Sequence, residues 1–210
     1  MAEVILGANA EKININSLTK KNVLVLGEHG SGKTLLLKRI ACFYLENNIP
    51  VIVLDTVCEH KEKSLAYSLK NEFAHRVKIA ETNSGKDIAR LLNEENGLIL
   101  INLSNEVEES NRVKDSELRR LLRKNAFEKC DTILNKVAEA SKGKEIAIIG
   151  DEVDYSMQSL ASAFEMKNIH IVLVPNEQNY LTLPFDVIIQ VYYKQKKEMT
   201  QNIRNKQVLA

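Results

Sequence analysis

The sequence Gly27-Glu-His-Gly-Ser-Gly-Lys-Thr34 is the most informative part of this 210-residue chain. It directly follows an apolar run at residues 23–26, and apolar side chains recur at helical spacing over residues 35–44. Gly30 and Gly32 permit a tight turn in which successive backbone N–H groups point inward. A strand, a glycine-rich turn and a helix in this order predict a cradle for an anion at the helix N-terminus.

The same eight residues match the full pattern G-x-x-x-x-G-K-T, which is typical of loops that bind nucleoside triphosphates. Lys33 is predicted to reach the β- and γ-phosphates, and Thr34 to bind Mg²⁺ through its hydroxyl. The alternative is a glycine-rich turn that carries an exposed lysine, which the flanking strand and helix disfavour. The predicted nucleotide-binding residues are Glu28, His29, Gly30, Ser31, Gly32, Lys33, Thr34 and Leu35.

Two adjacent carboxylates, Asp151-Glu152, follow a further apolar run at residues 146–149. An acid at the end of a buried strand can hold Mg²⁺ opposite Thr34, so Asp151 is predicted to be a metal ligand. Glu152 is placed to orient or deprotonate an attacking water. The pair favours hydrolysis over phosphate transfer to a metabolite, although it could simply end a strand in a polar loop. Asp154 is expected to be a solvated loop acid.

Short apolar runs alternate with amphipathic stretches along the chain. Continuous apolar strands between helices predict an α/β fold with a mainly parallel central sheet covered on both faces. The length suits a single domain over residues 1–210, with residues 1–20 as a short N-terminal extension and 194–210 as a basic tail. The predicted strands lie at residues 23–26, 51–54, 77–79, 98–101, 146–149, 169–174 and 187–193, and the predicted helices at 31–44, 115–140 and 156–166.

Polar residues stand at the ends of several predicted strands, where ligands of parallel sheets bind. Asp55 ends one strand, and Asn176 and Gln178 follow another. A side-chain amide beside the phosphate loop could sense the γ-phosphate through a hydrogen bond, and an ordinary loop amide is the alternative for each. His170 lies inside a predicted strand and is expected to be a core or edge residue rather than a ligand.

Composition narrows the function classes. The chain is 44% apolar and 27% charged, as is ordinary for a soluble protein, and it has neither a membrane-spanning run nor a signal peptide at its N-terminus, so a cytoplasmic location is expected. The three cysteines fit no metal motif and are expected to be reduced. The net charge of +1 neither favours nor excludes a nucleic-acid partner, because a local basic stripe matters more. The candidate stripes are Arg119, Arg120, Arg123 and Lys124 in the long helix, and Lys194, Lys196, Lys197, Arg204 and Lys206 in the tail.

In their order, these segments resemble the HerA–FtsK superfamily of DNA-pumping ATPases over residues 4–192. Residues 5–8 and 13–18 are similar to the short strand pair that often precedes the phosphate loop there. The compact chain is most similar to the genome-packaging ATPases of double-stranded DNA viruses, including archaeal ones. The further segments that carry the resemblance are the phosphate loop, residues 51–60, residues 98–104, Ile148-Ile-Gly-Asp-Glu152 and Val172-Leu-Val-Pro-Asn176.

The resemblance implies a RecA-like three-layer fold, with ATP and Mg²⁺ as cofactors. It also implies translocation or packaging of double-stranded DNA by a homo-oligomeric ring, a pentamer or a hexamer, with a capsid or recruiting protein as a further partner and the host cytoplasm as the location if the protein is viral. Two positions depart from the superfamily pattern. Asn176 stands where a sensor glutamine is usual, with Gln178 two residues late, and Lys167 stands near the usual place of a trans-acting arginine. All three are candidate catalytic residues, but a lysine cannot make the bidentate fork of an arginine.

Three other interpretations remain open at this stage. A cellular HerA-like DNA-processing ATPase would carry the same motifs. A nucleoside or nucleotide kinase would suit the length, but Asp151-Glu152 and the lack of an evident arginine-rich lid disfavour it. A nucleotide-dependent switch or partitioning protein would be expected to carry guanine-specific or additional lysine motifs, which we do not find.

Overall fold

The central strands of this chain are mainly apolar, as expected for a sheet that helices cover on both faces. The computed structural model describes residues 3–8, 12–55, 64–75, 78–82, 90, 92, 97–102, 112–141, 143–153, 163–175 and 183–192. Within these residues, eight strands form one sheet in the order β1-β8-β2-β7-β6-β3-β5-β4, and every neighbouring pair is parallel. The strands are β1 (Glu3–Ala8), β2 (Val23–Gly27), β3 (Val51–Asp55), β4 (Lys78–Thr82), β5 (Gly97–Asn102), β6 (Ile146–Val153), β7 (Ile169–Pro175) and β8 (Val187–Val191).

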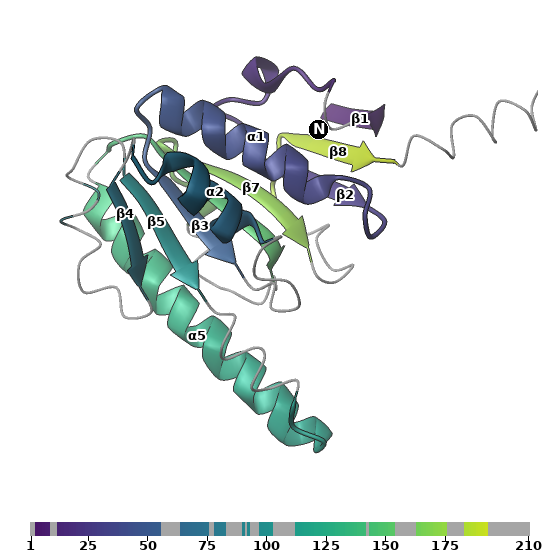
Figure 1. The fold of residues 1–210 in the computed structure, drawn as a ribbon, viewed down its shortest axis with the longest axis vertical. Helices are drawn as coiled ribbons and strands as arrows, with labels where there is room; N and C mark the ends of the chain where they lie inside the picture. Colours follow the sequence, from purple (N-terminus) through teal and green to yellow (C-terminus); the bar gives the residue numbers. More distant parts are fainter. Residues whose placement is uncertain are drawn as a thin grey trace, which may run out of the picture.

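Helices flank the sheet to give three layers (Figure 1). The helices α1 (Lys33–Glu46) and α2 (Leu65–Phe73) lie on one face, and α5 (Ser116–Ser141) lies on the other. Successive residues of β2 show the division, because Val23 and Val25 pack in the apolar cluster that contains α1, whereas Leu24 packs in the cluster that contains α5. Side chains that alternate between two buried faces explain why β2, and β3, β5 and β6 up to the polar residues near their C-terminal ends, are apolar.

The long helix α5 packs on the sheet through its C-terminal half. Ile133, Leu134 and Val137 are buried in the core, whereas Leu118 and Leu121 near the start of the helix are exposed. A 26-residue helix is about 39 Å long at ~1.5 Å per residue, and its N-terminal half runs past the edge of the sheet (Figure 1). The helix therefore presents a projecting arm as well as a core face.

Most of the elements predicted from the sequence are confirmed. The predicted strands at residues 23–26, 51–54, 98–101, 146–149 and 169–174 lie within β2, β3, β5, β6 and β7, and the long predicted helix is α5. The strand predicted at 77–79 is β4, shifted toward the C-terminus, and the last strand ends at Val191. The short helix α2 was not predicted, and most of the helix predicted at 156–166 lies outside the described residues.

One expected strand is wrong. The segment at residues 13–18 was expected to pair with residues 5–8 as a short strand, but it contains the 3₁₀ helix η1 (Ile15–Ser17). The Asn14 side chain accepts a hydrogen bond from the Asn16 N–H at 3.2 Å, and the Ser17 hydroxyl donates to the Asn14 carbonyl at 2.8 Å. Short polar side chains that bond to the nearby backbone favour a turn over a strand ladder, which explains the difference.

Candidate nucleotide-binding site

The glycine-rich loop occupies the carboxyl edge of the sheet, between the end of β2 and the start of α1. Gly30 and Gly32 adopt the left-handed backbone conformation, with φ angles of 73° and 99°. Gly32 is the N-cap residue of α1, and because glycine has no side chain, no side-chain hydrogen bond caps the helix. The first N–H groups of a helix have no partner within the helix, so those of α1 point into the loop as donors for an anion.

The start of the loop is packed tightly against β8. A Cβ atom on Gly27 would lie 2.5 Å from the Ser31 hydroxyl oxygen and 2.6 Å from the Val191 carbonyl oxygen, so no side chain fits there. The Ser31 hydroxyl oxygen is buried, and no hydrogen-bond partner for it lies among the residues that the structure describes. Such an atom is costly to bury unless a ligand or water satisfies it, so Ser31 is suited to bond a phosphate oxygen.

Lys33 folds over the loop. Its Nζ donates to the carbonyl oxygens of Gly27 and Glu28, both at 2.9 Å. An ammonium carries three donors, so this arrangement holds the charge above the loop and leaves a donor for a phosphate oxygen. The contact of Lys33 with the β- and γ-phosphates stays a prediction.

The fold brings Thr34 and Asp151 together from positions 117 residues apart. The Thr34 hydroxyl donates to Asp151 Oδ2 at 2.7 Å, and Asp151 is only 2% exposed. A hydroxyl oxygen and a carboxylate oxygen are hard ligands of the kind that Mg²⁺ prefers, and Mg²⁺ usually binds one or two protein ligands together with waters and phosphates. The two residues predicted as metal ligands therefore have the chemistry and the spacing for this ion.

Glu152 follows Asp151 in an unusual backbone conformation. Its φ angle is 55°, in the left-handed region that non-glycine residues seldom adopt, and the pairing of β6 with β7 shifts register at this point. The side chain of Glu152 is exposed, in contrast to that of Asp151. Backbone strain of this kind is often concentrated at functional sites.

Backbone register places further strand ends beside this pair. Asp55 at the end of β3 is the Cα partner of Asp151 in β6 and of Asn102 in β5. The sequence indicated Asp55 as a strand-end acid but did not reveal that it neighbours Asp151. Asn102 was not singled out, because a single asparagine after an apolar run is a weak signal.

The other predicted site residues divide into three groups. Glu28, His29 and Leu35 are exposed around the loop. Lys167 is exposed two residues before β7 begins, at the amino edge of the sheet, so it lies opposite the edge that carries the loop of its own chain. Asn176 and Gln178 follow β7, and Asp154 follows β6, but all three lie outside the described residues.

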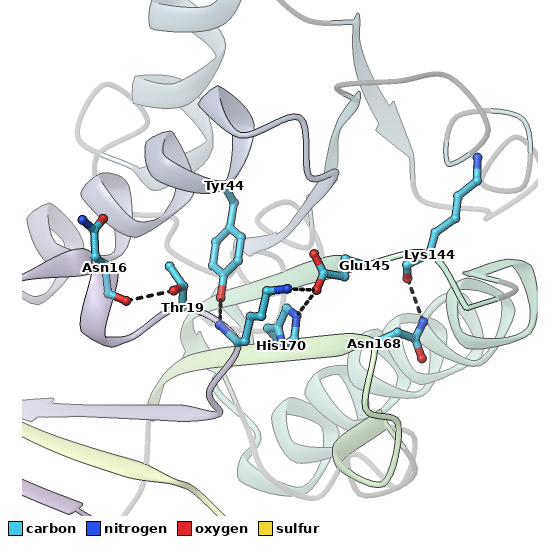
Figure 2. Close-up of polar contacts among 8 residues, drawn as sticks. Asn16, Thr19, Tyr44, Lys144, Glu145, Asn168 and His170 are labelled. Carbon is cyan, nitrogen blue, oxygen red and sulfur yellow. Dashed lines mark hydrogen bonds and ion pairs between the residues drawn. The ribbon is translucent and has the colours of Figure 1, made fainter.

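His170 lies in a polar cluster at this opposite edge (Figure 2). It is buried, as expected, and its ring stacks on that of Tyr44 with centroids 6.0 Å apart. His170 Nε2 is 3.9 Å from Glu145 Oε1, which Lys20 Nζ approaches to 2.6 Å. Burial lowers the pKa of His170, the nearby Glu145 carboxylate raises it, and the charge of Lys20 lowers it further.

The predicted basic face of α5 is exposed at each position whose side chain the structure describes, namely Arg119, Arg120 and Lys124. The Arg119 guanidinium also donates from Nε and Nη2 to the Val113 carbonyl at 3.1 and 2.7 Å. Arg119 therefore ties down the start of the helix. The side chain of Arg123 and the whole basic tail at residues 194–210 lie outside the described part.

Two other expectations concern the cysteines and the membrane. Cys42 is half-buried and in no disulfide, and burial raises the pKa of its thiol to about 12, so it is protonated at neutral pH. Cys58 and the side chain of Cys130 lie outside the described residues. Among the described helices, none combines the length and the apolar character needed to cross a bilayer.

Two solved structures of one viral protein are similar to this chain. Both are of the genome packaging NTPase B204 from Sulfolobus turreted icosahedral virus 2. The complex with AMPPCP is 15% identical, and the match covers 86% of this chain and 79% of that chain with a TM-score of 0.47. The complex with ATP-gammaS is 18% identical, with coverage of 90% and 81% and a TM-score of 0.48.

No curated protein matches the sequence. A family model does match, and it describes the central domain of the helicase HerA over residues 7–168, which is most of the chain. The parallel sheet, the helical layers on both faces and the loop between β2 and α1 confirm the expected RecA-like three-layer P-loop NTPase fold. The chain therefore belongs to the family of the HerA central domain, within the HerA–FtsK superfamily that its motifs resemble.

Proposed function

We propose that this chain is a Mg²⁺-dependent ATPase that couples hydrolysis to the movement of double-stranded DNA as a ring of identical subunits. The observation that carries the proposal is the 2.7 Å hydrogen bond between Thr34 Oγ1 and Asp151 Oδ2. This contact joins the phosphate loop to β6, which carries two adjacent carboxylates near its C-terminal end. Membership of a helicase family supports the DNA-dependent part.

The loop would bind the triphosphate through three kinds of group. The N–H groups at the start of α1 supply directed donors, the Ser31 hydroxyl supplies another, and Lys33 Nζ supplies a positive charge. Thr34 and Asp151 would hold Mg²⁺, which offsets the charge of the β- and γ-phosphates when it is bound. Glu28, His29, Gly30 and Leu35 complete the wall of the loop.

Glu152 would act on the attacking water. Its carboxylate accepts a proton as the water oxygen bonds to the γ-phosphorus, and the bond from that phosphorus to the bridging oxygen of ADP breaks. The neighbouring Asp151 is committed to Thr34, so the two adjacent acids have separate tasks. Asn176 or Gln178 is proposed to report the state of the γ-phosphate, because both follow β7, which lies between β2 and β6.

DNA contact is assigned to exposed basic side chains of α5. Arg120 and Lys124 on the projecting arm of α5 are exposed, and Lys124 makes only a loose 3.6 Å pair with Glu128. A motor that moves along any sequence must grip phosphates, which carry no sequence information. One subunit offers a small stripe, but a pentamer or hexamer would sum several such stripes around a channel.

The proposal is tested by an ATPase assay with and without duplex DNA, run beside a panel of nucleoside phosphate acceptors. We expect hydrolysis without an acceptor, stimulation by duplex DNA of any sequence, and a steep loss of stimulation with salt. Lys33→Ala should abolish tight nucleotide binding, because the cradle loses its cation. If ADP forms only when an acceptor is present and DNA has no effect at any salt concentration, the chain is a kinase and the proposal is wrong.

A further inference from the structure

Two exposed large apolar side chains, Leu35 and Tyr192, flank the phosphate loop. Among the described residues, the large apolar side chains with the most exposure are Leu35, Tyr67, Leu118, Leu121 and Tyr192. Leu35, 43% exposed, is in the first turn of α1, and Tyr192, 48% exposed, comes directly after β8. Exposed aromatic rings are a recurrent means of binding a flat apolar ligand.

Strand register fixes Tyr192 next to the loop. Val191, the last residue of β8, is the Cα partner of Gly27, the first residue of the loop. The Val191 carbonyl oxygen lies so close to the Cβ position of Gly27 that no side chain fits between the two backbones. Figure 1 shows β8 ending beside the connection from β2 to α1, on the right of the view. Tyr192 is therefore the first residue that leaves the sheet on this side of the loop.

The positions of Thr34 and Asp151 set the direction in which a triphosphate would lie across the sheet edge, with its base toward Tyr192. Thr34 and Asp151 mark the side where Mg²⁺ and the γ-phosphate belong, and Asp151 is on β6, two strands from β2 with β7 between them. β8 adjoins β2 on the other side. A triphosphate aligned with its γ end toward β6 has its α-phosphate, ribose and base directed over β8.

We propose that Tyr192 is the base-contacting residue of the nucleotide site and that its ring stacks on the base. This inference rests on the proposed function, since it assumes that the loop binds a nucleoside triphosphate. Stacking uses the π-face that all bases share and does not read hydrogen-bonding edges. Tyr192 therefore supplies affinity for the base without distinguishing ATP from GTP, and its large ring favours purines over the smaller pyrimidines.

The test compares two probes on purified protein with Mg²⁺, namely ATP and inorganic tripolyphosphate, which has the phosphates but no base. Loss of base–aromatic stacking by alanine substitution corresponds to roughly a 5- to 140-fold loss of affinity. We expect Tyr192→Ala to weaken ATP binding by such a factor and to leave tripolyphosphate binding unchanged. Tyr192→Phe, which keeps the ring, should bind ATP as the parent does.

Tyr67 provides the matched control, because it is a similarly exposed tyrosine at 43% and lies on α2. Tyr67→Ala should bind both probes as the parent does. The inference is overturned if Tyr192→Ala retains the parent affinity for ATP, or if it weakens ATP and tripolyphosphate equally. A parent chain that binds neither probe overturns the proposed function together with this inference, so the two failures are distinguishable.

Discussion

Two neighbouring carboxylates at the end of β6 have opposite surroundings. Asp151 is buried and accepts a hydrogen bond from Thr34, whereas Glu152 is exposed and its backbone lies in the left-handed region. A non-glycine residue in that region is disfavoured by about 1–2 kcal/mol. The turn of the backbone between them directs one acid into the core and keeps the other at the surface, which suits a metal ligand and a group that handles water.

Glu152→Gln should retain nucleotide binding and lose hydrolysis. The amide keeps the size and hydrogen-bonding ability of the side chain but cannot accept the proton of the water, and general-base positioning typically contributes about 10²–10⁴-fold in rate. Equilibrium binding of ATP and steady-state turnover should therefore separate in this variant. Glu165→Gln, a change at an exposed glutamate that precedes β7, is the control and should alter neither. Parent-like turnover by Glu152→Gln would show that Glu152 is not the base.

At the scale of elements, β6 places Asp151 by packing as well as by pairing. Gly150, immediately before Asp151, has no space for a side chain, because an added Cβ would overlap Val153 Cγ2 and lie 2.8 Å from Leu173 Cδ2. Neither neighbour can withdraw easily, since Val153 and Leu173 are both in the core. The glycine is thus required by the contact between β6 and β7.

Gly150→Ala should therefore damage both stability and activity. Overpacking of a core typically costs about 1–3 kcal/mol, which urea denaturation would measure as a lower free energy of unfolding. The displacement of β6 should also separate Asp151 from Thr34 and reduce ATPase activity. Gly143→Ala is the control, because Gly143 has a φ angle of 82° but nothing within 4 Å of an added Cβ. This variant should lower the free energy of unfolding, because alanine is strained at a positive φ angle, but it should not change the ATPase activity per folded molecule.

The arm of α5 is the element assigned to DNA. Its C-terminal half is held in the core, so a change near its start should not disturb the nucleotide site. Arg119, Arg120 and Lys124 are the exposed cations with described side chains on this arm, and the Arg119 guanidinium already donates to the Val113 carbonyl.

Arg120→Glu should lower the stimulation of the ATPase by duplex DNA and leave the basal rate unchanged. Reversing a phosphate-contacting charge should also make the dependence of binding on salt less steep. Lys136→Glu is the matched control, because Lys136 is an exposed cation on the same helix but next to the sheet, away from the projecting arm. Equal stimulation of Arg120→Glu and the parent would exclude this arm and shift the assignment to the C-terminal tail.

At the scale of the whole molecule, the sheet separates two polar regions. The loop and the acidic strand end lie at the carboxyl edge, and the His170 cluster of Figure 2 lies at the amino edge. Because burial lowers the pKa of His170 below its ordinary value of 6.5, the folded state prefers the neutral ring. The stability that this preference supplies is complete above pH 6.5 and is lost as the pH falls below it, since the unfolded chain then binds the proton more readily.

His170→Phe should reduce this dependence on pH. Phenylalanine can stack on Tyr44 but does not titrate, so its free energy of unfolding should fall less than that of the parent between pH 7.5 and 5.5. Glu145→Gln should make the free energy of unfolding fall more steeply over the same pH range. The Glu145 carboxylate raises the pKa of His170, so its loss lowers that pKa further and makes protonation of the buried ring more costly. His75→Gln, at an exposed histidine, is the control. Identical pH profiles for the parent and His170→Phe would contradict this account.

A ring should require a cation from a neighbouring subunit. Lys167 is exposed at the edge opposite its own loop, so in the proposed ring it would act on the nucleotide site of another copy of the chain. In well-studied cases such a group contributes roughly 10³–10⁵ in rate. We therefore expect specific ATPase activity to rise with protein concentration, and Lys167→Ala to abolish the rise.

Mixing two inactive variants tests this arrangement directly. Lys33→Ala lacks a working loop but keeps Lys167, whereas Lys167→Ala has an intact loop. Mixed rings should regain activity, because some loops then face an intact Lys167. Specific activity that stays constant across the dilution series of a proven monomer, or no recovery on mixing, would remove the trans-acting role of Lys167.

The sequence by itself determined the local features of this protein. The loop at residues 27–34, the acidic pair at 151–152 and most of the strands follow from spacing, glycine content and apolar runs, which are properties of neighbouring residues. The family could be recognised from the order of these segments, and the family model agrees. The prediction failed at residues 13–18, where side chains of asparagine and serine bond to the backbone and form a turn.

Only the tertiary structure decided which distant residues meet. The motifs predicted that Asp151 lies opposite Thr34, but the strand order β8-β2-β7-β6 is what places Tyr192 beside Gly27, and no local pattern carries that information. The tight contact at Gly150, the left-handed backbone of Glu152 and the stacking of His170 on Tyr44 likewise arise from packing between elements. The physical reason is that periodicity specifies which face of a strand is buried, whereas close packing of whole layers specifies what that face touches.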